Sequence, residues 1–190
     1  MKNKLKIELK KIYHNIIDVS KFTRTKMNFL ISEEKINEFY KKVNPFYILG
    51  MGRSGTFFLS QLLDKPDKIC VYHEPLHSDF KAIVEASNSE KKSNSYINSF
   101  RKKYMYLKLK NKNIKKYGEV NSNLRYHSET IKNSIPNVRI LHLVRDGRDV
   151  VRSIMERNHY TGDDIGHHSL TPNEKDDYFN KWNNMGRFEK

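Results

Sequence analysis

Three short segments of the sequence contain side chains that can bind anions or transfer protons. They are segment 50–56 (GMGRSGT), segment 73–75 (HEP) and segment 145–148 (RDGR). Each follows directly on an apolar run whose length suits a buried strand. The carboxyl ends of parallel strands lie at one edge of a sheet, and ligands bind beyond that edge. The sequence therefore predicts that the three segments form a single site.

Segment 50–56 is typical of a turn that binds an oxyanion. A glycine-rich turn between a strand and a helix exposes backbone N–H groups, and the helix N-terminus adds about half a positive charge. Arg53 can add a bidentate contact to the same anion. In the ATP-binding pattern G-x-x-x-x-G-K-[ST], Thr56 would occupy the lysine position, which argues against a magnesium-bound triphosphate. An ordinary tight turn would explain the glycines, but not the combination of Arg53, Ser54 and Thr56.

The third segment predicts a second anion site. Ser153 follows Arg145 two turns into the next predicted helix, so the guanidinium and the hydroxyl can hold an anion that is separate from the first. Arg148 and Arg152 add positive charge nearby, or they pair with carboxylates on the surface of the same helix.

Segment 73–75 supplies two candidates for a general base, which must come within about 3 Å of the proton that it removes. Histidine titrates close to neutral pH, which suits His73 to this role. Glu74 is the neighbouring candidate, and Pro75 restricts the backbone beside it. The alternative is that the stretch HEPLH is a polar turn without chemistry.

An α/β domain is predicted to position these segments. We expect strands at 46–49, 69–72, 119–121 and 138–144, an edge strand at 104–110 (YMYLKLK), and helices at 57–63, before Pro136 and around 150–155. Strands that alternate with helices predict three layers, in which a mostly parallel central sheet is flanked by helices.

Both ends of the chain differ from this central part. Residues 1–44 are predicted to form a basic helical extension, because their apolar residues recur at helical spacing. These residues are Leu5, Leu9, Ile12 and Ile16. The tail 158–190 is polar, with a predicted helix around Tyr178, Phe179 and Trp182. It ends without a closing strand, so we expect the domain to be truncated at its C-terminal end.

The composition is that of one globular domain kept inside a cell. The 190 residues suffice for one core, and 37% of them are hydrophobic. No apolar run approaches the roughly 20 residues that cross a bilayer, and the first residues lack the apolar region of a secretory signal. We therefore expect a cytoplasmic protein without a transmembrane segment. The single cysteine, Cys70, excludes an internal disulfide and argues against a structural zinc site.

The net charge of +14 favours an anionic partner. Segment 101–116 (RKKYMYLKLKNKNIKK) mixes lysines with tyrosines, as proteins that bind single-stranded nucleic acid do. Because no known nucleic-acid signature accompanies it, a solvated basic surface is the favoured interpretation, and a nucleic-acid partner is not.

Two stretches resemble the nucleotide signatures of the sulfotransferases, which use 3′-phosphoadenosine 5′-phosphosulfate as the sulfuryl donor. They are GMGRSGTFFLSQLL (50–63) and LHLVRDGRDVVRS (141–153). The resemblance covers residues 45–157 and is closer to the branch that acts on carbohydrates and protein tyrosine than to the cytosolic small-phenol branch. It implies a P-loop NTPase-like sulfotransferase fold for residues 45–190, no metal, and a hydroxyl acceptor on a carbohydrate, a lipid or a tyrosyl group.

The resemblance also implies roles for individual residues. The family's loop residues that bind the 5′-phosphosulfate match Arg53, Ser54, Gly55 and Thr56. Many members have a hydroxyl residue at the next position, Phe57, so one phosphate hydrogen bond is expected to be lost here. Residues that match Arg145 and Ser153 bind the 3′-phosphate.

A glutamate after the second strand is the proposed general base of the carbohydrate- and tyrosine-sulfating relatives. This match favours Glu74 over His73 as the base, although both stay candidates. Arg53 is the residue that we expect to stabilise negative charge on the transferred group.

Three other interpretations stay open. A magnesium-ATP-dependent kinase of related fold would use Asp146 as a metal ligand, and a nucleic-acid-binding module would use segment 101–116. Donor binding without catalysis is the third interpretation. Family members commonly close the 3′-phosphate pocket with a later glycine-containing basic segment, and no equivalent follows Trp182.

Overall fold

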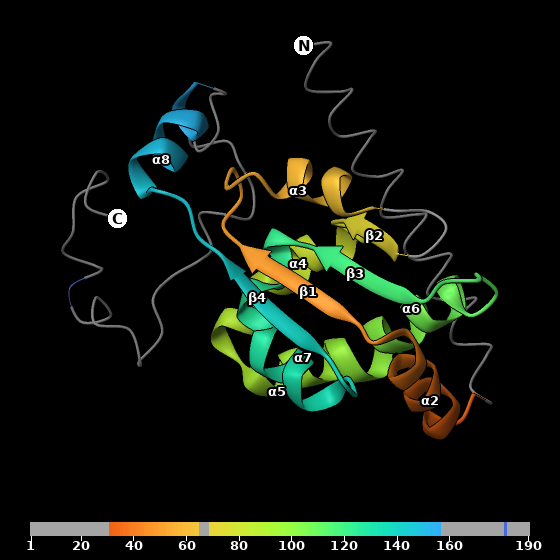
Figure 1. The fold of residues 1–190 in the computed structure, drawn as a ribbon. Coiled ribbons are helices and arrows are strands. Elements are labelled where there is room, and N and C mark those ends of the chain that lie inside the picture. Colours follow the sequence, from red (N-terminus) through yellow and green to blue (C-terminus); the bar gives the residue numbers. More distant parts are fainter. Residues whose placement is uncertain (1–30, 65–68, 157–180, 182–190) are drawn as a thin grey trace, which may run out of the picture.

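The computed structural model describes residues 31–64, 69–156 and 181, and this part of the chain is an α/β domain (Figure 1). Its sheet has four parallel strands in the order β2-β3-β1-β4. The strands are β1 Phe46–Gly50, β2 Ile69–His73, β3 Lys116–Val120 and β4 Arg139–Leu143. The predicted α/β class with a parallel sheet is confirmed, and the carboxyl ends of the strands lie at one edge.

Helices connect the strands and cover both faces of the sheet. Their bounds are α2 Glu33–Val43, α3 Thr56–Leu63, α4 His77–Asn88, α5 Glu90–Asn94, α6 Lys102–Leu109, α7 Ser128–Ser134 and α8 Gly147–Met155. The π-helix η1 spans Ser95–Arg101 and the 3₁₀ helix η2 spans Ser122–His127. Among these segments, no helix is both long enough and apolar enough to span a bilayer.

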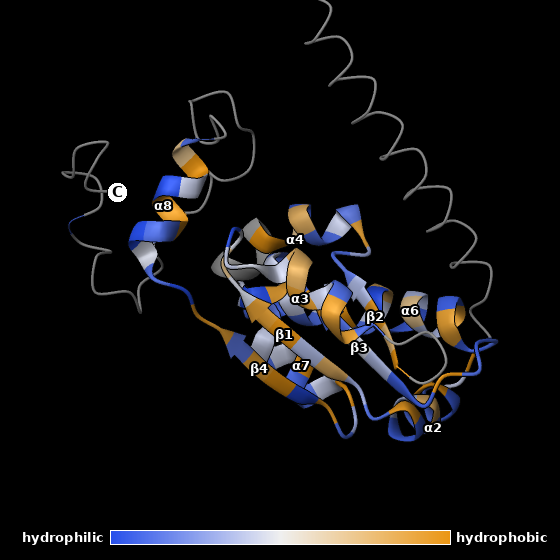
Figure 2. Cartoon of the chain, turned by 45° about the horizontal axis from the view of Figure 1, so that its top comes forward, coloured by the Kyte–Doolittle hydropathy of each residue, from blue (hydrophilic) through white to orange (hydrophobic). Residues whose placement is uncertain are grey.

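Successive side chains of each strand point to opposite faces of the sheet, and this alternation separates two hydrophobic clusters. On one face, Tyr47 and Tyr117 pack with buried residues of α2, α6 and α7 in the larger cluster. On the other face, Ile48, together with the neighbouring strands, packs against apolar side chains of α3. Figure 2 shows β1 as hydrophobic along most of its length, as expected for a strand buried on both faces. The helices and the sheet thus form the predicted three layers.

The end of the predicted extension belongs to this core. Helix α2 begins after Ser32, whose hydroxyl accepts a hydrogen bond from the Lys35 N–H at 3.4 Å, and it ends at Asn44 in the left-handed region. Its residues Ile36 and Tyr40 are fully buried in the larger cluster. Residues 1–30 of the predicted extension 1–44, and the helix predicted around Tyr178, lie outside the described residues.

The prediction of an edge strand at 104–110 is wrong, because residues 104–109 lie in α6 and Lys110 is its C-cap. The segment's alternation of tyrosine, leucine and lysine suggested a strand, but the buried residues recur every fourth position through η1 and α6. They are Ile97, Arg101, Met105 and Leu109. Arg101 and Lys102 are also buried, so two cations of the basic segment 101–116 face the interior and not a nucleic-acid partner.

His127 is a buried titratable group at the end of η2. Its Nδ1 lies 2.8 Å from the Ser93 hydroxyl. Burial lowers the pKa of His127 from 6.5 to about 4, because the charged form would lose its hydration. The folded protein therefore holds this imidazole in its neutral form.

We expect the free energy of unfolding to fall as the pH falls from about 6.5 to about 4. In that window the unfolded chain binds a proton on His127 and the folded chain does not, which costs about 3 kcal/mol of stability when complete. The measurement is urea denaturation of the wild type and His127→Asn at several pH values. The asparagine variant should show a shallower pH dependence, and equal slopes would contradict the prediction.

Candidate functional site

The structure brings the three predicted segments together at the carboxyl edge of the sheet. They line a cleft of about 550 Å³ that also includes residues of η2. Its polar lining includes Arg53, Thr56, His73, Glu74, Ser122 and Arg145. Because β1, β2 and β4 are parallel, their ends deliver these side chains to one place.

The glycine-rich turn presents the N-terminus of α3 to the cleft. Arg53 and Gly55 both have left-handed backbones, with φ of 70° and 91°, and Ser54 donates its N–H to the Met51 carbonyl at 3.3 Å. Gly55 is the N-cap of α3, and no side chain among the described residues caps the helix there. The first N–H groups of α3 are therefore placed to bind an anion.

Arg53 connects the turn to the segment after β4. Its Nε and Nη2 both donate to the Ser153 hydroxyl of α8 at 3.1 Å. In return, Arg145 donates from Nη1 to the Arg53 carbonyl at 3.0 Å. Arg145 and Ser153 thus lie close to the turn, and the Arg53 guanidinium contacts the hydroxyl of the second predicted anion site.

The other charged residues of this segment pair with each other on the surface of α8. Asp146 is the N-cap of α8 and accepts from the Arg148 N–H at 2.9 Å and from its guanidinium. These hydrogen bonds from Arg148 lower the pKa of Asp146 below its usual value. Arg152 pairs with Asp149 at 2.9 Å. Arg148 and Arg152 therefore have local structural partners, and Asp146 caps a helix.

His73 and Glu74 have different surroundings at the end of β2. The Nε2 atom of His73 lies 3.1 Å from the Thr56 hydroxyl, and its ring packs edge-to-face on Phe57 with centroids 5.5 Å apart. Glu74 leaves the strand with a left-handed backbone, and its Oε1 accepts hydrogen bonds from the backbone N–H (3.3 Å) and the hydroxyl of Ser122.

One wall of the cleft is apolar. Helix α3 buries its polar residues Thr56 and Ser60, whereas Phe57 and Phe58 are 63% and 71% exposed. Phe57 and Phe58 line the cleft together with Met51, Phe80 and Ile154. At position 57 an aromatic ring packs edge-to-face on His73, and the expected loss of a phosphate hydrogen bond there stays a prediction.

Sequence reasoning missed Phe58, Phe80 and Arg125 as lining residues of the cleft. Arg125 lies in the short helix η2 and donates to the Ser122 carbonyl at 2.8 Å. An arginine in a polar stretch, with no glycine turn or strand beside it, carries no signal that could have identified it. Its proximity to Glu74 follows only from the pairing of β2 with β3.

The polar groups of the cleft are guanidiniums, hydroxyls and backbone N–H groups, with one carboxylate and one imidazole. Within the described ranges, no group of three His, Cys, Asp or Glu side chains is arranged to hold a metal ion. Such donors suit a ligand with two anionic groups, and the carboxylate suits a proton transfer beside it.

Comparison with known proteins gives one result. No curated protein and no solved structure matched the chain. The model of the sulfotransferase family matches residues 45–188, which include all four strands and the cleft. Because this match covers most of the sequence, the chain belongs to the sulfotransferase family.

Proposed function

We propose that this protein transfers a sulfuryl group from 3′-phosphoadenosine 5′-phosphosulfate to a hydroxyl of a carbohydrate, a lipid or a tyrosyl group. Membership of the family supports sulfuryl transfer in general. The observation that carries the finer proposal is that Arg53, Glu74 and Arg145 line one cleft, while Ser153 is joined to it through its hydrogen bonds with Arg53. The features shared with the carbohydrate- and tyrosine-sulfating branch are the Arg-Ser-Gly-Thr turn and a glutamate after β2.

The chemistry of the lining groups fits the donor. The turn 53–56 and the N-terminus of α3 would hold the 5′-phosphosulfate, since the space beside the Gly55 Cα is open: apart from the adjacent residues and the backbone of α3, no described atom lies within 4 Å of the position that a Cβ would occupy. Arg145 and Ser153 would hold the 3′-phosphate. Arg53 lies in the turn and donates to Ser153, which supports a position for its guanidinium between the two anionic groups of a bound donor.

The bound donor supplies a sulfuryl group whose bond to the phosphate oxygen breaks as the acceptor oxygen attacks from the opposite side. Glu74 takes the proton of the acceptor hydroxyl, and the Arg53 guanidinium stabilises negative charge that develops on the departing side. Positioning and charge stabilisation supply most of the rate, as they do in phosphoryl transfer.

Glu74 is preferred to His73 as the base because of the partners of each. The Nε2 atom of His73 is within hydrogen-bond distance of Thr56, a residue of the donor-binding turn, and its ring is packed against Phe57. Both hydrogen bonds described for the Glu74 carboxylate go to Oε1. Its Oε2 is thus the oxygen offered to an acceptor, and His73 is assigned to orienting Thr56.

Calorimetry tests the donor assignment without an acceptor. We expect adenosine 3′,5′-bisphosphate to bind with the same affinity in magnesium and in EDTA. ATP, which lacks the 3′-phosphate, should bind at least roughly tenfold more weakly, because charge-assisted hydrogen bonds at Arg145 are lost. Magnesium-dependent binding of ATP with no binding of the bisphosphate would refute the proposal and favour the kinase interpretation.

A panel of acceptors then tests the reaction. Sugars, glycolipids and tyrosyl peptides are each incubated with donor that carries ³⁵S in its sulfuryl group, and labelled products are separated. Transfer to one class of acceptor identifies the class of substrate. If the protein binds the donor but transfers sulfuryl to no acceptor and not to water, it is a donor-binding protein and the proposed transferase activity is refuted.

A further inference from the structure

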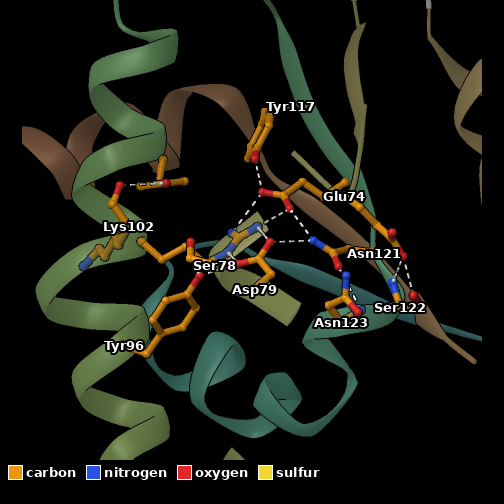
Figure 3. A network of polar contacts seen from close by, with 12 residues as sticks. Glu74, Ser78, Asp79, Tyr96, Lys102, Tyr117, Asn121, Ser122 and Asn123 are labelled. Atoms are coloured by element: carbon orange, nitrogen blue, oxygen red, sulfur yellow. Dashed lines mark hydrogen bonds and ion pairs between the residues drawn. The ribbon is translucent and has the colours of Figure 1, made fainter. Parts of the chain in front are cut away.

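The Glu74 carboxylate is held by one neighbouring residue. Glu74 has a φ of 43°, and its backbone N–H donates to the Val120 carbonyl at 3.4 Å, so β2 stays attached to β3 just beyond the strand. Its side chain then accepts from the Ser122 N–H and the Ser122 hydroxyl through the same oxygen, Oε1 (Figure 3). Two donors on one oxygen fix both the position and the rotation of the carboxylate.

Ser122 is itself held rigidly by its neighbours. It is nearly fully buried, and its carbonyl accepts from Arg125 at 2.8 Å. The preceding residue, Asn121, donates its backbone N–H to Ile48 of β1 at 2.9 Å. The Asn121 side chain caps η2 by accepting from the Asn123 N–H at 3.0 Å. Ser122 therefore cannot move without disturbing the link between β3, β1 and η2.

Asn121 is also tied into a buried ionic cluster. Its Nδ2 donates to Asp79 at 2.9 Å and to Glu119 at 3.3 Å. Arg101 neutralises both carboxylates, with contacts of 2.7 and 3.0 Å to Asp79 and 3.0 Å to Glu119, and Tyr117 donates to Glu119. All of these charged side chains are almost completely buried. Figure 3 shows Asn121 between this cluster and Ser122, so one continuous network connects the core with Glu74.

We propose that Ser122 is a positioning residue for sulfuryl transfer, and that it fixes the Glu74 carboxylate so that Oε2 meets the acceptor hydroxyl. This inference rests on the proposed function. A base must be held close to its productive geometry by residues that are themselves locked in place, and Ser122 meets both conditions. Without the hydroxyl, Glu74 keeps a single bond to a backbone N–H and can rotate away from the acceptor.

The test is a double-mutant cycle with Ser122→Ala, Glu74→Gln and both substitutions together. Transfer of ³⁵S from labelled donor is measured with the fastest acceptor of the panel and with water as acceptor. We expect Ser122→Ala to lower kcat roughly tenfold to a hundredfold, because a small displacement of a catalytic group has effects of this size. Calorimetry should give an unchanged affinity for adenosine 3′,5′-bisphosphate.

The cycle separates positioning from a general structural effect. In the Glu74→Gln protein, Ser122→Ala should lower kcat less than about twofold further, since residues that act through one group are not additive. Ser122→Thr, which keeps the hydroxyl, should restore most of the activity. Ser93→Ala is the control: it removes a buried serine that binds His127 and should lower the unfolding temperature while kcat stays near the wild-type value. If Ser122→Ala does not fold, Ser122→Cys replaces it in the cycle.

Two results would overturn the inference alone. In the first, Ser122→Ala has the kcat of the wild type although Glu74→Gln is slow. In the second, the effects of the two single substitutions on the activation free energy add up fully in the double variant. A wild type that binds the bisphosphate but transfers sulfuryl neither to any acceptor nor to water would instead refute the proposed function, and with it this inference.

Discussion

Arg53→Ala is expected to lower kcat for sulfuryl transfer by about 100- to 1000-fold, which corresponds to the loss of one donor that stabilises charge in a transition state. Arg53 is the residue that touches both halves of the site, since its side chain contacts Ser153 and its carbonyl accepts from Arg145. Arg53→Lys should recover only part of the activity, because an ammonium group lacks the planar fork that binds two oxygens at once.

The measurement is a comparison of kcat and of bisphosphate affinity between variants. Arg148→Ala is the matched control, because it also removes one positive charge near the cleft, but its side chain is 91% exposed and pairs with Asp146. We expect Arg148→Ala to keep most of the wild-type activity. Equal activities of Arg53→Ala and Arg148→Ala would contradict the proposed role of Arg53. The loss of activity would then come only from the removal of one positive charge and not from a specific contact with the transferred group.

Arg101→Met is expected to lower the free energy of unfolding by about 3–5 kcal/mol, even though methionine fits a hydrophobic core. The substitution leaves Asp79 and Glu119 buried without a counter-ion, and an uncompensated buried charge is among the most destabilising changes known. The two carboxylates raise the pKa of the Arg101 guanidinium above its usual value, although its burial acts in the opposite direction. Urea denaturation at neutral pH measures the effect.

Two controls define the origin of this loss. Lys103→Met removes a cation two residues away that is partly exposed and lies 3.9 Å from Glu33, and it should cost less than about 1 kcal/mol. Combining Arg101→Met with Asp79→Asn and Glu119→Gln removes the stranded charges and should recover part of the stability. If the triple variant were as unstable as Arg101→Met alone, the packing of the long side chain would be the cause.

The strands and the cleft were largely predictable because their signals are local. β1, β2 and β4 are short apolar runs followed by glycine or charged residues, and parallel strand ends converge whatever the details of packing. The observed bounds differ from the expected ones by a residue or two at the ends of these strands. The roles of Arg53, Glu74 and Ser153 in catalysis and donor binding stay predictions. The structure places Arg53 and Glu74 in the lining of one cleft, and Ser153 contacts that lining through Arg53.

The sequence-based predictions fail where contacts between residues far apart in the sequence determine the structure. Arg101 interrupts the apolar stripe of η1 and α6, so the segment did not show a hydrophobic helical face. Its burial depends on Asp79 and Glu119, which lie far away in the sequence and supply the compensating charges. Ser122 follows a short predicted strand, and this position suggests only that it lines the acceptor side or orients another residue of the site. Its contact with Glu74 depends on the pairing of β2 with β3, which single-sequence periodicity does not specify.

The order of the strands along the chain has a consequence for folding during synthesis on the ribosome. The turn that holds Arg53 is synthesised early, but its contacts Arg145 and Ser153 lie 92 and 100 positions further along the chain. A nascent polypeptide that extends through η2 already contains Glu74 and Ser122, yet it still lacks Arg145 and Ser153, the two residues proposed to bind the 3′-phosphate. If the proposed donor site is correct, it can therefore be completed only after β4 has paired with β1 and α8 has been synthesised.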